Sequence, residues 1–161
     1  MSSLASPRGF TLFETLIATG ILVTALAGLA QLFILSAHLT RQANTSGAAL
    51  AAAQDRLEAL VGLPFEYDAA GTPVTDPALT ASPPSSLDQD TPPFVDWVDA
   101  AGDASASGDG AVFVRRWRVT AIADDAPDAV AVEVCVLRAP ADDVAVSGAE
   151  ACLSTVRTRQ P

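Results

Sequence analysis

The chain has 161 residues, half of them apolar, and its formal net charge at pH 7 is −10. It contains no lysine, so all of its basic side chains except one histidine are arginines. This length allows one membrane segment and one modest domain, and because many of the apolar residues are alanine, the core of that domain must be small. The acidic balance disfavours direct binding to nucleic acid, which requires a basic face.

The most informative stretch is an uncharged apolar run near the N-terminus. No charged side chain occurs between Glu14 and Arg41. A charged side chain at the bilayer centre costs about 2.5–3.5 kcal/mol on insertion scales, and about 20 apolar residues cross the hydrocarbon layer. The run therefore predicts a transmembrane segment over residues 10–38. Glu14 lies at its margin, where a carboxylate is expected to be functional and to have a partner.

The order of segments at the N-terminus differs from that of a secretory signal, in which the apolar core precedes the cleavage site. Here a polar leader, residues 1–9, comes first, and cleavage after Gly9 would leave the whole apolar run on the mature chain, beginning at Phe10. The stretch Gly9-Phe10-Thr11-Leu12-Phe13-Glu14 resembles the processing site of type IV prepilins and type II secretion pseudopilins, and the match extends closely over residues 8–35.

This resemblance implies specific roles for three residues. A dedicated membrane peptidase would cut after Gly9, and the new terminal residue, Phe10, would be N-methylated. The resemblance also implies that Glu14 pairs with the amino group of Phe10 on a neighbouring subunit and so sets the register of helices in a filament.

A single long helix is predicted from Phe10 to about Val61, because no proline interrupts this stretch and Gly62 followed by Pro64 supplies a stop. Such a helix exceeds the thickness of a bilayer, so residues 39–62 should form an amphipathic half in the periplasm. Its predicted apolar stripe, which should pack onto the globular domain, consists of Leu50, Leu57, Leu60 and Val61.

Three small residues in the membrane half, Gly20, Thr24 and Gly28, are spaced by four. This spacing favours close packing against other helices in lipid. An alanine-rich apolar segment without such a role is the alternative interpretation.

Residues 63–110 form a region rich in proline, glycine and acidic side chains, with nine carboxylates and no basic residue from Glu66 to Asp109. We expect a few apolar anchors to hold parts of it on the domain, and the remainder to be mobile, solvent-facing loop. These anchors are Phe65, Tyr67, Phe94, Trp97 and Val98. We predict a solvated acidic loop, with no metal or cofactor. The alternative is a calcium site in this region, whose candidate ligands would be Asp96, Asp99, Asp103 and Asp109.

Residues 111–161 are predicted to form an antiparallel sheet with strands at 111–122, 130–137 and 151–158. Together with the long helix, this predicts an α+β fold in which the sheet lies on the helix, as the resemblance to pilins also implies. A basic cluster, Arg115, Arg116 and Arg118, falls on the first strand. We expect an exposed strand face that pairs with the acidic region, or alternatively a patch that binds another subunit.

The two cysteines, Cys135 and Cys152, lie on the second and third predicted strands. In an exported domain an even count favours a disulfide, and two buried reduced cysteines are the alternative. Two cysteines alone cannot build the usual structural zinc site of four ligands.

An enzyme is not predicted, because no nucleophile–base order, phosphate loop or metal-ligand cluster occurs, and the one histidine, His38, falls at the membrane exit of the helix. The segments around residues 114–120 and 152–157 resemble minor pilins of the PilV type. The expected function is therefore that of a minor pilin, which primes a type IV pilus from the inner membrane with its C-terminal domain in the periplasm.

That function implies as partners other pilins, the prepilin peptidase, the inner-membrane assembly platform and membrane lipid, with no nucleic acid bound directly. Two other functions remain open at this point. One is a minor pseudopilin of a type II secretion system, and the other is a bitopic membrane protein whose periplasmic domain binds a ligand or metal.

Overall fold

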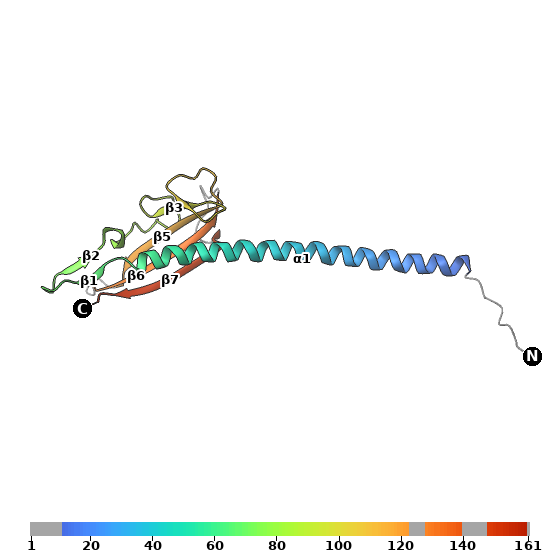
Figure 1. The fold of residues 1–161 in the computed structure, drawn as a ribbon, viewed down its shortest axis with the longest axis horizontal. Helices are drawn as coiled ribbons and strands as arrows, with labels where there is room; N and C mark the ends of the chain where they lie inside the picture. The colour runs from blue at the N-terminus through green and yellow to red at the C-terminus, as the bar shows by residue number, and fades with distance from the viewer. Residues whose placement is uncertain (1–10, 123–127, 140–147, 161) are drawn as a thin grey trace, which may run out of the picture. The chain divides into compact units, whose positions relative to one another are not determined.

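The computed structural model describes residues 11–122, 128–139 and 148–160. Its first element is the helix α1, Leu12–Val61, which belongs to two compact units of the chain, residues 1–43 and 44–161. The cleavage position predicted at Gly9 and Phe10 lies outside the described residues. Figure 1 shows α1 and the sheet of the second unit.

Local hydrogen bonds and a proline account for the two ends of α1. At its start the Thr11 hydroxyl accepts a hydrogen bond from the backbone N–H of Glu14 at 3.3 Å, which satisfies one of the free donors of the first turn. At its end the N–H of Gly62 donates to the carbonyl of Glu58, and Pro64 follows. The predicted helix, including its end at about Val61, is confirmed.

The second unit contains a five-stranded antiparallel sheet with the order β4-β3-β5-β6-β7. Its three long strands are β5 (Phe113–Ala121), β6 (Ala129–Arg138) and β7 (Ala151–Thr158), which confirm the three predicted strands. The two short strands are β3 (Val95–Val98) and β4 (Ala104–Ser105). The α+β fold, a long helix packed against a small antiparallel sheet, is thus confirmed.

The acidic region of residues 63–110 carries more regular structure than its composition predicts. It contains β3 and β4, a hairpin of β1 (Phe65–Tyr67) with β2 (Pro73–Thr75), and the 3-10 turn η1 (Pro77–Leu79). Apolar side chains at intervals, among them Leu79, Leu87 and Phe94, are buried. The expected anchors are confirmed for Phe65, Phe94 and Val98, which are buried, and much of the remaining region is exposed loop, as expected.

The predicted apolar stripe of α1 is confirmed for Leu57 and Leu60, which pack against the core, but not for Leu50 and Val61. Ala49, Ala53 and Leu60 are fully buried, whereas Leu50 and Val61 are 41% and 40% exposed. Leu57 is partly buried against the core. The prediction was wrong for Leu50 and Val61 because the contact face runs through Ala49 and Ala53, whose short side chains let the helix approach the sheet closely.

The core between the helix and the sheet follows the alternation of the strands. Phe113, Trp117 and Val119 of β5 are buried together with the alternate valines of β6, namely Val130, Val132, Val134 and Val136. A smaller cluster lies on the opposite face of the sheet and includes Val114 and Leu137. Both faces of the central strands therefore carry apolar contacts.

Candidate functional site

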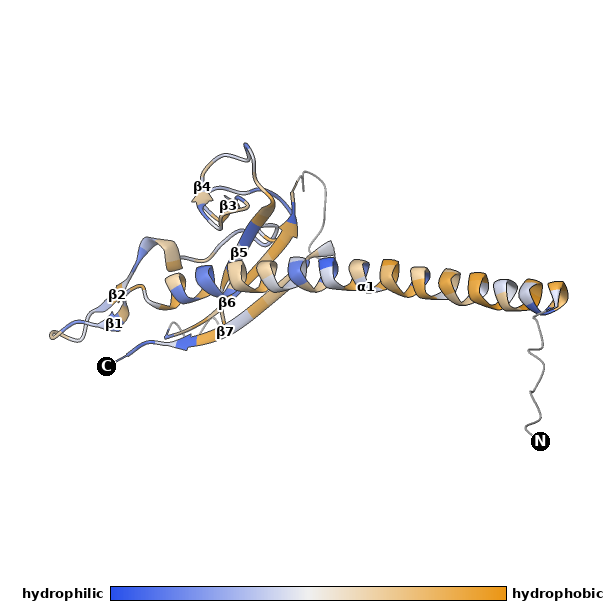
Figure 2. Ribbon diagram, turned by 45° about the vertical axis from the view of Figure 1, so that its right-hand side comes forward, coloured by the Kyte–Doolittle hydropathy of each residue, from blue (hydrophilic) through white to orange (hydrophobic). Residues whose placement is uncertain are grey.

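The first part of α1 is apolar on all its sides. Among the described residues it contains the one helix segment long and apolar enough to cross a membrane, and none of the most apolar window is buried. Figure 2 shows this change along α1, with apolar turns in the first part and polar turns interspersed in the second. A helix that is hydrophobic all round must be covered by lipid or by other helices, so this half fits a single-pass membrane protein.

Glu14 is the one acidic residue in the first turn of this segment, and it is exposed. No ion pair of Glu14 with another described residue is formed within the chain. Thr11 and Glu14 also have the spacing of a capping box, in which the N-cap hydroxyl and the acidic side chain stabilise the start of the helix. This local role was missed in the sequence, although the pattern Thr-x-x-Glu is its signature.

The predicted packing stripe has open space around its glycines. A Cβ atom added at Gly20 or Gly28 would meet no atom within 4 Å. The hydroxyl of Thr24 donates to the carbonyls of Gly20 and Ile21 at 3.1 and 2.9 Å. Thr24 thus satisfies its hydroxyl within the helix, and the stripe can approach another helix without leaving a polar group unpaired.

Arg115 is the centre of a polar network between the sheet and α1. Its side chain is only 3% exposed, and it binds both oxygens of Asp96 at 2.8 and 2.9 Å. It also donates to the Ala52 carbonyl at 3.0 Å and to Asp55 at 2.9 Å. Burial of the guanidinium lowers the pKa of Arg115, but the hydrogen bonds to Asp96 and Asp55 raise this pKa by more. The net shift in the pKa of Arg115 is therefore upward.

The other two arginines of the basic cluster lie on the opposite face of β5. Arg116 is fully buried and donates to Asp90 at 2.8 Å and to the carbonyl of Asp88 at 3.0 Å. Arg118 pairs with Glu133 of β6 at 2.6 Å. The expectation of pairing with the acidic region is confirmed for Arg115 and Arg116, but the expected exposed face is wrong, since ion pairing with carboxylates lets these arginines be buried.

Two arginines near the C-terminus join elements that are far apart in the sequence, and sequence reasoning missed both. Arg157 donates to the carbonyls of Leu60 and Leu63 at 3.2 and 3.0 Å, so it caps the C-terminal end of α1. Arg159 lies 4.2 Å from the ring centroid of Phe65 and pairs with Asp128 at 3.1 Å. A lone arginine in a C-terminal strand gives no sequence signal for a cap.

The predicted disulfide is confirmed. Cys135 and Cys152 are bonded and stand directly opposite each other on β6 and β7, with their Cα atoms 4.2 Å apart. This spacing matches a non-hydrogen-bonded pair of an antiparallel ladder, where side chains approach most closely. The bond therefore fixes the edge strand β7 to the rest of the sheet.

No calcium site is formed by the acidic residues named above, and no group of potential metal ligands occurs among the described residues. Asp96 is bound by Arg115, and Asp99 instead accepts hydrogen bonds from the backbone N–H groups of Ala101 and Asp103. These carboxylates act as ion-pair and turn acceptors, which explains why an acidic stretch need not gather around a cation.

Comparison of the chain with family models, with curated proteins and with solved structures finds no match in any of the three.

Proposed function

We propose that the chain is a minor pilin. In this proposal a peptidase cuts after Gly9, the first half of α1 holds the protein in the bacterial inner membrane, and the domain faces the periplasm. The subunit then enters a type IV pilus filament, where it belongs to the group of subunits that primes assembly.

One observation carries this proposal: the stretch from Gly9 to Glu14 runs into α1, which begins at Leu12 and is apolar and exposed along its first part. A membrane anchor alone would need no carboxylate at its margin, since ionisable groups at membrane depth are costly unless they are paired. The same helix continues into a domain whose sheet is joined by a disulfide bond, as an exported domain can be.

The carboxylate of Glu14 has two candidate roles, and they make different demands on its chemistry. As a partner for the amino group of Phe10 on a neighbouring subunit, it must be charged. As a member of a capping box with Thr11, it can be replaced by glutamine, because the amide also reaches the backbone N–H groups. Variants can separate these two roles.

The experiment compares recovery of full-length variants with filaments sheared from cells. We expect Glu14→Ala and Glu14→Gln both to remain in the membrane and to be lost from filaments, since each removes the charge. Thr11→Ala removes the capping hydroxyl but keeps the carboxylate, so it should still be recovered with filaments, as should the control Glu58→Ala farther along the helix.

Recovery of Glu14→Gln at the wild-type level would contradict the charge-dependent role and reduce Glu14 to a helix cap. Absence of the wild-type chain from filaments, with normal insertion in the membrane, would contradict the function as a whole.

A further inference from the structure

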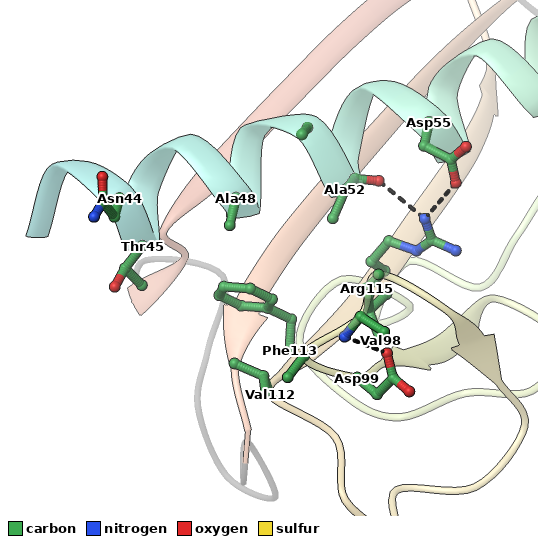
Figure 3. A pocket seen from close by; sticks show the side chains of 14 residues that line it. Asn44, Thr45, Ala48, Ala52, Asp55, Val98, Asp99, Val112, Phe113 and Arg115 are labelled. Carbon is green, nitrogen blue, oxygen red and sulfur yellow. Dashed lines mark hydrogen bonds and ion pairs between the residues drawn. The ribbon is translucent and has the colours of Figure 1, made fainter. Parts of the chain in front are cut away.

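One edge of the five-stranded sheet is a long strand without a neighbour among the described residues. The sheet ends in β4 on one side and in β7 on the other. β4 has only two residues, and the loop before it lines a groove with α1, as Figure 3 shows for Asp99. β7 has eight residues, and all of them pair with β6 without interruption (Figure 1). Proteins usually keep edge strands short or cover them, so an open edge of this length indicates an interaction surface.

The register with β6 determines which backbone groups of β7 face outward. Cys135 and Cys152 form a non-hydrogen-bonded pair, so the N–H and C=O groups of Cys152 point away from β6. Because these groups alternate in direction along a strand, those of Ser154 and Val156 also point to the open side. Within the part of the chain that the structure describes, the N–H groups of Ser154 and Val156 have no acceptor. The open side of β7 thus carries a row of donors and acceptors that an extended backbone can pair with.

The chain itself uses the same side of this strand just beyond its end. The N–H of Gln160 donates to the carbonyl of Phe65 at 3.2 Å, and the N–H of Tyr67 donates to the carbonyl of Gln160 at 2.9 Å. β1 therefore lies beside Gln160 in a parallel bridge. This edge accepts a neighbouring strand at residue 160, and among the described residues it is open from Cys152 to Val156.

The side chains along β7 do not oppose the addition of a strand. Proline and outward charged side chains commonly protect an edge. β7 contains no proline, and its one charged residue, Arg157, donates to the carbonyls at the end of α1. Ser154 and Val156 are exposed and uncharged, whereas Leu153 on the other face packs against the core. An added strand therefore needs uncharged side chains beside the first two residues and an apolar side chain beside Leu153.

A second copy of this chain does not fit the edge. β7 runs in the same direction as the adjoining part of α1, because Arg157 near the end of β7 contacts the end of the helix (Figure 1). Antiparallel pairing of two β7 strands would reverse one of the two helices, although both copies need the apolar part of α1 in the same membrane. Parallel two-fold pairing would place each residue opposite its own copy, whereas a parallel ladder joins each residue to the two that flank the opposite one.

We infer that β7 binds an extended segment of a different protein, which adds to the sheet as its sixth strand. In this form of recognition the main-chain hydrogen bonds supply affinity, and the alternate side chains supply specificity. The segment is uncharged on the face beside Ser154 and Val156 and apolar on the face beside Leu153. The inference rests on the proposed function in one respect, namely that the occupant is a co-assembling subunit.

Photo-crosslinking in cells that assemble filaments tests the inference. A photo-crosslinking amino acid is placed in the full-length chain at Ser154 and, in a separate variant, at Val156. We expect both variants to react with one segment of another protein, and the reaction site should shift by two residues between them, because paired strands keep a fixed register. The control position is Thr120, which is exposed on β5 away from the edge and should not give these products.

A proline variant separates backbone pairing from side-chain contact. With the crosslinker at Ser154, Val156→Pro removes one outward N–H and keeps the bonds to β6, so the product should fall at least about tenfold. Val156→Ala keeps the N–H and should retain the product within about twofold. If Val156→Pro lowers the thermal midpoint more than Val156→Ala does, Ser154→Lys with the crosslinker at Val156 takes its place, because a lysine on an edge blocks strand addition.

Products with a second copy of this chain, reaction sites that do not shift by two residues, or equal yields from Val156→Pro and Val156→Ala would each overturn the inference. The two proposals fail separately. If the chain is absent from filaments but the shifted products form, the edge pairing stands and the proposed function fails. If the chain enters filaments and no shifted products form, the function stands and the edge inference fails.

Discussion

Replacement of Arg115 by alanine should destabilise the domain far more than replacement of any exposed arginine. The variant leaves Asp96, whose side chain is only 15% exposed, without its bidentate partner. Breaking one side of a buried ion pair costs about 3–5 kcal/mol. The contact with Asp55 adds little, because that carboxylate is 76% exposed and is screened by solvent. We therefore expect a loss of about 3 kcal/mol, at the lower end of that range.

The assay is thermal unfolding of the full chain in detergent micelles, followed by near-ultraviolet circular dichroism. Trp97 and Trp117, the two tryptophans of the chain, both belong to the sheet, so the signal reports on the domain and not on the membrane helix. For a domain of this size roughly 3–6 °C corresponds to 1 kcal/mol, and the midpoint should fall by about 10–15 °C.

The matched control is Arg118→Ala. Arg118 and its partner Glu133 have side chains that are 38% and 33% exposed, so this pair should contribute at most about 1 kcal/mol. The double variant Arg115→Ala with Asp96→Ala should recover part of the loss, because it also removes the stranded carboxylate. Equal losses in Arg115→Ala and Arg118→Ala, or a double variant with no recovery, would show that burial of the pair between Arg115 and Asp96 does not set its contribution to stability.

Three other properties of the domain can be tested by similar measurements. Reduction of the bond between Cys135 and Cys152, which are 17 residues apart, should lower the free energy of unfolding by about 3 kcal/mol, and an unchanged midpoint in reductant would contradict this. Arg157→Ala should speed amide hydrogen exchange at the end of α1, because it uncaps two carbonyls, whereas Arg138→Ala should not. A hydrogen bond from Tyr67 lowers the pKa of Asp128, so the ionised carboxylate stabilises the fold above the ordinary carboxyl pKa. This stability should be lost as the pH falls through the lowered value, and Asp128→Asn should show a weaker dependence of the midpoint on acid pH than the wild type.

The helix, the three long strands and the disulfide could be predicted because each depends on a local pattern. The absence of proline over a long stretch predicted α1. The strict alternation of valines with other residues predicted the buried face of β6 from Val130 to Val136. The pairing of Cys135 with Cys152 required only that adjacent strands meet in a plausible register.

The contact face of α1 and the arginine contacts could not be predicted, since they depend on tertiary distances. The helix packs through Ala49 and Ala53 because close approach to the sheet outweighs the greater hydrophobicity of Leu50. Likewise, Arg157 reaches carbonyls that are 94 and 97 residues away in the sequence. A pattern within one segment carries no information about such partners.

Intact-mass analysis of the N-terminus in membrane and filament fractions distinguishes cleavage after Gly9 from retention of the leader. We expect a mature chain that begins at Phe10 and carries one added methyl group on its amino terminus. Gly9→Val should block this processing, because a β-branched side chain stiffens and crowds the cleavage position. A chain that retains Met1 in filaments, or one that is cut inside the apolar run after Glu14, would contradict the proposed processing and with it the function as a minor pilin.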